Sequence, residues 1–523
     1  MSWWDRRLQI GWAALVMGLS VLLSRFMGLI RDKIIAYLFG AAQESDIYFA
    51  AFVIPDFINY LLAGAYFSVT LIPLLAAAFA ENRDDGWRFF SAVLTWITVG
   101  ITVLTAAAMI FAPRLAVVAA PGLNPQAWER LAYFLRIVLP AQICFLPGSC
   151  LLALLYLRKQ FTIPALVPII YNGTIILGGV LFRQKGMEGF CWGVLAGAFL
   201  GNFLLPYVAL RRSGDWQLGW CWWHPGLKRF LWLALPLMIG QSIVVLDEQL
   251  VRVFGSMTET GAISWLSYAR RIMLVPVGIV AQAAGVASYP FLSELVARRD
   301  FQGFHQTINA TLRNTLTLLI PLSVWMMVVS HPTIVLIFQQ GRFSADDTQR
   351  TMWLLIIFLS MVSCWGWQQI LGRAFYARQD TITPAVLGTL MTLLSLPVFY
   401  LATRWLGAAG VALASALSIG MYSLGLSFRW WRRFGGEVFA GLGKGVLQIG
   451  LQALAAAVPA VGMVTGCFWW WPNHPYVASL AGIAGSGTVF TIVFVFLGNL
   501  LTPHLIRPFL EKAGPLGRRL THP

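Results

Sequence analysis

Apolar runs of about 20 residues recur along the whole chain, with short polar segments between them. A run of about 20 apolar residues is long enough to cross the hydrocarbon core as a helix. We therefore expect an all-α polytopic membrane protein with about fourteen transmembrane helices. The expected spans are residues 8–31, 46–79, 88–112, 131–157, 163–182, 188–210, 229–254, 262–296, 308–330, 350–376, 383–403, 408–431, 445–468 and 476–500.

Four residues interrupt the first apolar run: Arg25, Gly28, Arg31 and Asp32. At about 100° per residue they fall within an arc of about 120°, so they share one face of one helix. An arginine near the bilayer centre costs about 2.5 to 3.5 kcal/mol on insertion scales. This face is therefore expected to line a wet cavity that binds an anionic ligand through Arg25 and Arg31. Asp32 is expected to orient or neutralise a neighbouring arginine, with a proton-carrier role as the alternative.

The chain repeats itself at an offset of about 220 residues. Residues 39–45 align with residues 254–260 at an offset of 215, and residues 159–164 align with residues 378–384 at an offset of 219 to 220. An even number of spans in each unit predicts two parallel six-helix lobes, related by a pseudo-two-fold axis along the membrane normal. The predicted division is 1–215 for the first lobe, 216–440 for the second, and 441–523 for two appended helices and a cytoplasmic tail.

The second half also carries arginines within its predicted spans, at positions 252, 270 and 271. Because both halves offer arginines, we expect Arg252 and at least one of the adjacent pair Arg270 and Arg271 to line the cavity. For the adjacent pair Arg270 and Arg271, snorkelling from a helix end to water is the alternative.

The formal net charge is +16, but its positive residues form short clusters between the spans, so a nucleic-acid-binding domain is not expected. Most clusters lie on one side when fourteen spans are threaded, which places both termini in the cytoplasm. Six cysteines and six histidines are scattered without the spacing of metal ligands. We therefore expect no cofactor, no metal and no enzymatic activity.

The residues Ser24 to Asp32, followed by Phe39-Gly40-Ala41 and Ser45-Asp46, resemble the N-terminal signature of the MurJ (MviN) lipid II flippase family. This family belongs to the multidrug/oligosaccharidyl-lipid/polysaccharide exporter superfamily. The resemblance implies fourteen helices, cytoplasmic termini, and a cavity that holds a diphosphate through Arg25, Arg31 and Arg271, with Asp32 and Asp46 beside them. It also implies that the last two helices offer a groove to a long lipid tail.

Several positions depart from the pattern of that family. Asn59 stands where the second helix usually has an arginine, and Arg270 and Leu274 stand where the eighth helix often has acids. Val251 replaces an acid of the seventh helix, with Asp247 one turn earlier. The cavity of this chain is therefore divergent, with Asn59 as an uncharged supporting residue.

The resemblance predicts a flippase that moves an undecaprenyl-diphosphate-linked peptidoglycan precursor across the cytoplasmic (inner) membrane of a bacterium by alternating access. Its partners would be the lipid-linked glycan, the bilayer and cell-wall synthesis proteins. One alternative is a flippase for another lipid-linked polysaccharide repeat unit. Another is a scaffold paralogue for envelope synthesis that does not transport. An exporter of cationic drugs would need acidic cavity residues, so the arginines argue against it.

Overall fold

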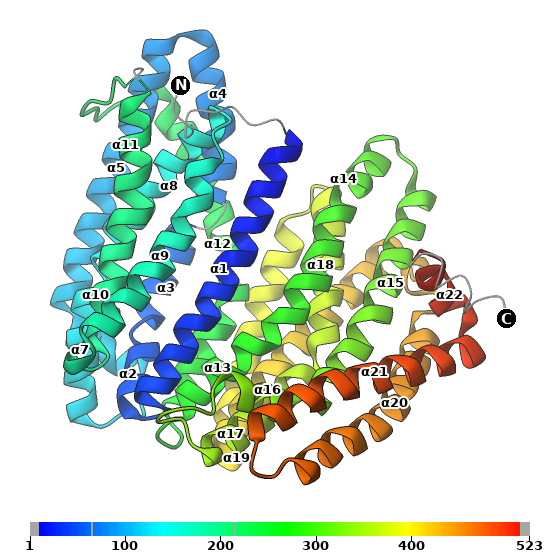
Figure 1. Cartoon of the computed structure of the whole chain (residues 1–523). Helices are drawn as coiled ribbons and strands as arrows, with labels where there is room; N and C mark the ends of the chain where they lie inside the picture. Colours follow the sequence, from blue (N-terminus) through cyan, green and yellow to red (C-terminus); the bar gives the residue numbers. More distant parts are fainter. Residues whose placement is uncertain (1–9, 64–65, 214–215, 513–523) are drawn as a thin grey trace. The chain divides into compact units, whose positions relative to one another are not determined.

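The computed structural model describes residues 10–63, 66–213 and 216–512. It divides into two compact units, residues 1–264 and 265–523, which are described separately (Figure 1). The first unit contains α1 (Ile10–Phe39), α2 (Gln43–Ala50), α3 (Val53–Ala63), α4 (Tyr66–Glu81), α5 (Arg83–Ile110), α6 (Ala112–Ala119), α7 (Pro125–Val138), α8 (Ala141–Leu157), α9 (Thr162–Leu181), α10 (Glu188–Gly197), the π-helix η3 (Ala198–Leu204), α11 (Leu205–Arg212) and α12 (Pro225–Gly255).

The second unit begins within α13 (Ala262–Pro276). It contains the π-helix η4 (Val277–Gln282), α14 (Ala283–Ala297), α15 (Phe301–Val328), α16 (Ser330–Ile337), α17 (Ala345–Ser360), α18 (Val362–Ala377), α19 (Ile382–Phe434), the 3-10 helix η5 (Glu437–Phe439), α20 (Leu442–Trp470), α21 (Pro475–Leu501) and α22 (Pro503–Lys512). The described residues contain no strand, so the predicted all-α class is confirmed.

Ten helical segments of the described residues are long and apolar enough to cross a membrane. The chain is therefore a multi-pass membrane protein. One of the ten is α19, which contains the non-helical Gly407 between the two predicted spans 383–403 and 408–431. Residues 46–79 were predicted as one span but contain the three helices α2, α3 and α4. The total of fourteen transmembrane helices stays a prediction.

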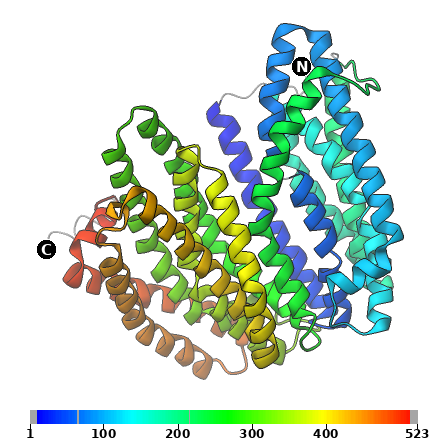
Figure 2. The same ribbon diagram turned by 180° about the vertical axis from the view of Figure 1, so that it is seen from behind.

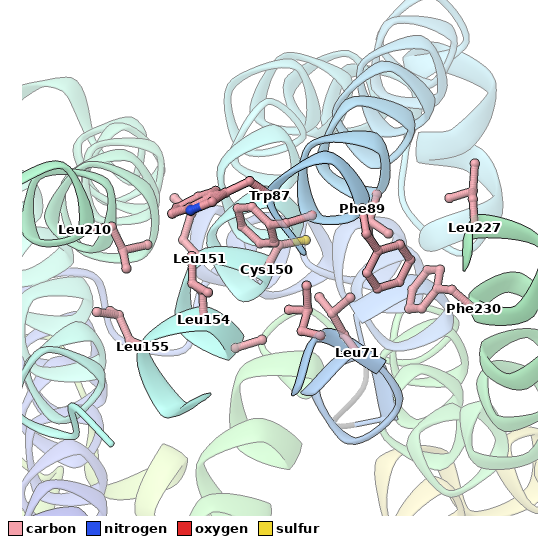
Figure 3. Packing of buried hydrophobic residues seen from close by; sticks show 14 of the residues in the cluster. Leu71, Trp87, Phe89, Cys150, Leu151, Leu154, Leu155, Leu210, Leu227 and Phe230 are labelled. Atoms are coloured by element: carbon pink, nitrogen blue, oxygen red, sulfur yellow. The ribbon is translucent and has the colours of Figure 1, made fainter. Parts of the chain in front are cut away.

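The core of the first unit joins helices that are distant in the sequence. Trp87 of α5 and Leu151 of α8 lie in one cluster with Leu71 of α4 (Figure 3). Leu227 and Phe230 of α12 belong to the same cluster. Lipid tails are as apolar as these side chains, so close van der Waals packing stabilises such contacts inside a membrane.

Helix α12 thus packs in the first unit, although it follows the predicted lobe boundary at residue 215. It contacts α3, α4 and α5 of that unit. The compact units therefore differ from the lobes 1–215 and 216–440, whose limits come from the sequence repeat and stay a prediction.

In the second unit, Phe304 of α15, Phe375 of α18 and Trp430 of α19 form one core cluster. The appended helices α20 and α21 pack against each other and against α15 (Figures 1 and 2). Their cluster includes Ala456 of α20 and Phe490 of α21.

Helices α8 and α18 end in the same backbone conformation. Lys159 follows α8 with φ 59°, and Gln379 follows α18 with φ 60°, exactly 220 positions later. In both places the next residue donates its N–H to a carbonyl five positions back, from Gln160 to Leu155 and from Asp380 to Phe375. Such a bond satisfies a carbonyl at a helix end that would otherwise lack a partner.

The connection between α12 and α13 is longer than the connection between α1 and α2. Helix α1 ends at Phe39 and α2 begins at Gln43, whereas α12 ends at Gly255 and α13 begins at Ala262. The later connection contains six residues and the earlier one three. The predicted lobes therefore differ in the length of this loop, and the repeat itself stays a prediction.

Candidate functional site

Arg31 of α1 lies in a polar cluster with Asp32 and with Asn172 of α9. Its Nη2 and Nε donate to Asp32 Oδ1 at 2.8 and 3.0 Å, and its Nη1 donates to Asn172 Oδ1 at 3.5 Å. The Asp32 side chain is only 2% exposed. Because a buried carboxylate needs a charged or hydrogen-bonding partner, Arg31 and Asp32 stabilise each other inside the unit.

The residues of α1 that contact Asn172 are spaced about one helical turn apart. Ser24 Oγ accepts a hydrogen bond from Asn172 Nδ2 at 3.4 Å. One turn later Gly28 is buried, and a Cβ at that position would meet Asn172 Oδ1 at 4.0 Å. Ser24, Gly28 and Arg31 therefore form the face of α1 that packs on α9.

Arg25 is exposed, unlike the other three residues of the predicted face. The predicted face of four residues is therefore divided in the structure. Gly28, Arg31 and Asp32 face the packed side of α1, whereas Arg25 remains accessible to its surroundings.

Arg252 of α12 forms a second polar cluster in the first unit. Its Nη1 donates to Asp56 Oδ2 of α3 at 2.8 Å, and its Nη2 donates to Glu248 Oε1 at 2.6 Å. Gln249 Oε1 accepts a further bond at 3.2 Å. The Arg252 side chain is 12% exposed, so two carboxylates compensate one largely buried guanidinium. Asn59 lies on α3 one turn after Asp56 and is half-buried.

Asp46 of α2 is a helix cap in this structure. Its carboxylate accepts hydrogen bonds from the N–H groups of Gly261 and Ser264, at 2.6 and 2.8 Å, and from Ser264 Oγ at 2.7 Å. These donors lie at the start of α13, where backbone N–H groups lack partners within the helix. Asp46 is buried, and both of its oxygens are engaged.

The adjacent arginines of α13 have different surroundings in the second unit. Arg270 is buried and donates from Nη1 to Ser415 Oγ of α19 at 3.4 Å. Arg271 is exposed. Of this pair, Arg271 is therefore the residue whose guanidinium is accessible to a ligand.

Three of the residues that hold these arginines were not predicted as site residues from the sequence: Asn172, Asp56 and Glu248. Glu248 had a local signal, because it lies four residues before Arg252 on one helix. Asn172 and Asp56 are polar residues within apolar runs, which marks them as unusual. Their partners, however, lie 141 and 196 positions away in the sequence.

The second unit contains a groove and a pocket along α15. An apolar groove of about 830 Å³ lies between α15, α21 and α22, with Leu318, Trp325 and Phe490 in its wall. A polar pocket of about 810 Å³ lies between the start of α15 and the η5 segment. Among the described residues, no group of three or more His, Cys, Asp or Glu side chains could hold a metal ion.

The model of the family described as lipid II flippase MurJ matches residues 35–473. This chain belongs to the MurJ family. A probable lipid II flippase MurJ of Vibrio cholerae is 25% identical over 511 residues, which are 93% of this chain and 95% of the relative. A lipid II flippase MurJ of Burkholderia cenocepacia is 26% identical over 461 residues, covering 85% of this chain and 88% of the relative. The predicted MurJ membership is thus confirmed.

Solved structures share the MurJ fold. A lipid II flippase MurJ in an inward closed conformation matches 94% of this chain and 100% of its own, with a TM-score of 0.77 and 24% identity. An inward-facing multidrug resistance MATE family transporter of the MOP superfamily matches 82% of this chain and 99% of its own, with a TM-score of 0.63 and 13% identity. At these identities the likeness concerns the fold alone.

Proposed function

We propose that this MurJ family protein moves lipid II, the undecaprenyl-diphosphate-linked peptidoglycan precursor, from the inner to the outer leaflet of the bacterial cytoplasmic membrane. It would do so by alternating access and would supply cell-wall biosynthesis. The family match over residues 35–473 and the curated relatives named as lipid II flippases support this proposal. The protein acts as a transporter and not as an enzyme.

The observation that carries the substrate class is the Arg31 guanidinium inside a membrane-spanning unit. A guanidinium has about five N–H donors. Asp32 and Asn172 engage three of them, through Nε, Nη1 and Nη2. About two donors remain for phosphate oxygens, which match the fork geometry of arginine. Arg25 and Arg271 are exposed and serve as further phosphate contacts in this proposal.

The direction of flipping follows from the membrane topology that we propose. Basic clusters such as Arg158-Lys159 and Arg432-Arg433 lie at or near helix ends, on the side that we propose retains positive charge. Both termini are then cytoplasmic, and the polar head of the precursor enters from the side where it is synthesised. The lipid tail stays in the bilayer throughout. Cell-wall synthesis proteins would be the protein partners.

The test is rescue of bacterial cells depleted of their own lipid II flippase. The wild-type chain should restore growth, and Arg31→Gln should abolish rescue at normal membrane levels. Arg31→Lys should rescue partly, because lysine retains the charge but loses the bidentate fork. Arg298→Gln is the matched control, because Arg298 is strongly exposed and pairs with Glu294 one turn away.

Each outcome of this rescue experiment distinguishes between functions. Full rescue by Arg31→Gln would remove Arg31 from the transport site. Failure of the wild-type chain to rescue, at normal expression, would favour another lipid-linked glycan as cargo or a role as an envelope-synthesis scaffold. Separating these two requires a leaflet-accessibility assay with a lipid-linked polysaccharide repeat unit, which only a transporter would expose.

A further inference from the structure

The polar pocket at the start of α15 is separate from the arginine clusters of the proposed transport site. Six polar side chains line it: Gln302, His305, Gln306, Asn309 and Arg313 of α15, and Glu437 of η5. Its volume of about 810 Å³ is within the range of small-molecule sites. All of these residues lie in the second unit.

Hydrogen bonds attach the η5 segment to α15 and form the wall of the pocket. His305 Nδ1 lies 3.1 Å from Glu437 Oε2. Asn309 Nδ2 donates to the carbonyl oxygens of Val438 and Ala440, at 2.8 and 3.0 Å. The Glu437 side chain remains 78% exposed, so its carboxylate stays accessible to a ligand.

Arg313 supplies the positive charge of the pocket. It lies within α15, a helix long and apolar enough to cross a membrane. Its exposed guanidinium has no hydrogen-bond or ion-pair partner among the described residues. His305 Nε2 is buried and likewise has no hydrogen-bond partner in the described part of the chain. Charged groups in a membrane normally bind water, another charged group or lipid phosphate, so Arg313 needs a partner from outside the protein.

The apolar groove begins one helical turn after Arg313. Thr317 and Leu318 line its start on α15, and Thr317 Oγ1 donates to the Arg313 carbonyl oxygen at 2.8 Å. Phe490 and Phe494 of α21 line the opposite side. Along α15, the Glu437 carboxylate therefore comes first, beside His305. Arg313 follows about 12 Å farther along the helix axis, and the apolar groove begins after Arg313.

We propose that this pocket and groove bind one bilayer phospholipid with a zwitterionic headgroup of the phosphoethanolamine class. Arg313 contacts the phosphate, Glu437 contacts the ammonium group, and an acyl chain lies in the groove. In such a lipid the ammonium group is outermost, the phosphate is deeper and the chains are deepest. Glu437, Arg313 and the groove occur in the same order along α15. The long side chains of Arg313 and Glu437 shorten the distance between their charged groups.

This phospholipid site goes beyond the proposed lipid II transport. The MurJ resemblance predicts instead that the groove holds the tail of the cargo. A polyprenyl diphosphate carries only negative charge in its diphosphate, so it gains nothing from Glu437. The contribution of Glu437 to binding therefore distinguishes a zwitterionic lipid from an anionic one.

The test is lipid retention by the purified full-length protein in native mass spectrometry. The probes are phosphatidylethanolamine, phosphatidylglycerol and undecaprenyl diphosphate, each added alone and in competition. We expect preferential retention of phosphatidylethanolamine, a loss of about tenfold in Arg313→Gln, and near wild-type retention in Arg313→Lys. Glu437→Gln should lower retention of phosphatidylethanolamine without lowering that of phosphatidylglycerol. Arg350→Gln, on α17, is the control.

Three results would overturn this inference. One is retention of phosphatidylethanolamine by Arg313→Gln at the wild-type level. Another is equal retention of phosphatidylethanolamine and phosphatidylglycerol by the wild-type protein. The third is displacement of phosphatidylethanolamine by equimolar undecaprenyl diphosphate, which would assign the site to the cargo. A wild-type melting temperature in each variant shows that it is folded, and none of these readouts requires flipping.

Discussion

At the residue scale, Asp380 shows how one side chain can stabilise the connection between two membrane helices. It lies between α18 and α19, and its carboxylate accepts hydrogen bonds from Thr383 N–H and Oγ1 at 2.9 and 2.8 Å. Arg433, near the end of α19, forms an ion pair with it. Partial burial raises the pKa of Asp380, but these hydrogen bonds and the Arg433 charge outweigh burial and hold the pKa below its usual value.

This lowered pKa predicts a stability contribution that depends on pH. Because the folded-state pKa is below the unfolded value of about 3.9, the contribution is fully present above about pH 4 and disappears as pH falls through the folded-state pKa. Asp380→Asn should lower stability at pH 7 by about 1 kcal/mol, since Arg433 is half exposed and its share is screened. Thermal unfolding of the detergent-purified protein measures this difference.

The same unfolding experiment has a matched control in Asp346→Asn. Asp346 is strongly exposed and pairs with Arg350 one turn away. Its replacement should leave the melting temperature nearly unchanged at every pH. A melting-temperature difference between wild type and Asp380→Asn that persists unchanged below pH 3 would contradict the assigned role of the carboxylate.

At the element scale, α19 contains a break that divides its 53 residues. Gly407 has φ 58° and ψ −137°, a conformation that side chains with a Cβ rarely adopt. Three residues later the chain packs tightly, because a Cβ at Gly410 would lie 1.9 Å from the Ala402 carbonyl oxygen. The predicted spans 383–403 and 408–431 meet at this glycine, so composition and hydropathy were sufficient to locate the break.

Gly407→Ala is therefore expected to strain the backbone of α19. The strain should cost about 1 to 3 kcal/mol, because the described surroundings leave room for a Cβ but the dihedral angles disfavour it. Thermal unfolding of the purified protein measures the cost. Gly450→Ala is the control, because Gly450 lies within α20, where an added Cβ meets no described atom within 4 Å. It should be neutral or stabilise by up to about 1 kcal/mol. Equal melting temperatures for both variants would refute the strain.

At the scale of the whole molecule, helix packing sets the boundary between the compact units. This boundary differs from the lobe boundary predicted from the sequence repeat. Helix α12 follows the predicted lobe boundary, yet its Leu227 and Phe230 lie in the core of the first unit. Arg252, farther along α12, pairs with Asp56 of α3 in the same unit. Apolar packing at one end of α12 and an ion pair at the other attach this helix to α3, α4 and α5.

A double-mutant cycle tests how strongly the ion pair holds α12. Asp56→Asn and Arg252→Gln should each destabilise the purified protein, and the double variant should lose less than the sum of the two. We expect a coupling energy of about 1 to 2 kcal/mol, because the Arg252 guanidinium is only 12% exposed, although Glu248 still pairs with it in Asp56→Asn. Thermal unfolding of the four proteins gives the coupling.

The matched control for this cycle is the exposed pair Glu294 and Arg298 on α14. Its side chains are 54% and 72% exposed. Their coupling should be about 0.5 kcal/mol or less, because solvent screens exposed pairs. A coupling for Asp56 and Arg252 as small as that of this exposed pair would mean that apolar packing alone attaches α12.

The sequence by itself determined the features that depend on neighbouring residues. The length of the apolar runs determined the helical membrane class, and the period of 3.6 residues placed Arg25, Gly28, Arg31 and Asp32 on one face of α1. The motifs around Asp32 and Asp46 were sufficient to predict the family.

Only the tertiary structure decided which residues meet. It placed Asn172 beside Arg31 and Asp56 beside Arg252, gave Asp46 a capping role at α13, and left Arg25 exposed. These outcomes depend on how helices distant in the sequence pack together, and helical periodicity carries no information about the partner of a face. A charged face must find a partner in a membrane, but the identity of that partner is a property of the packed fold.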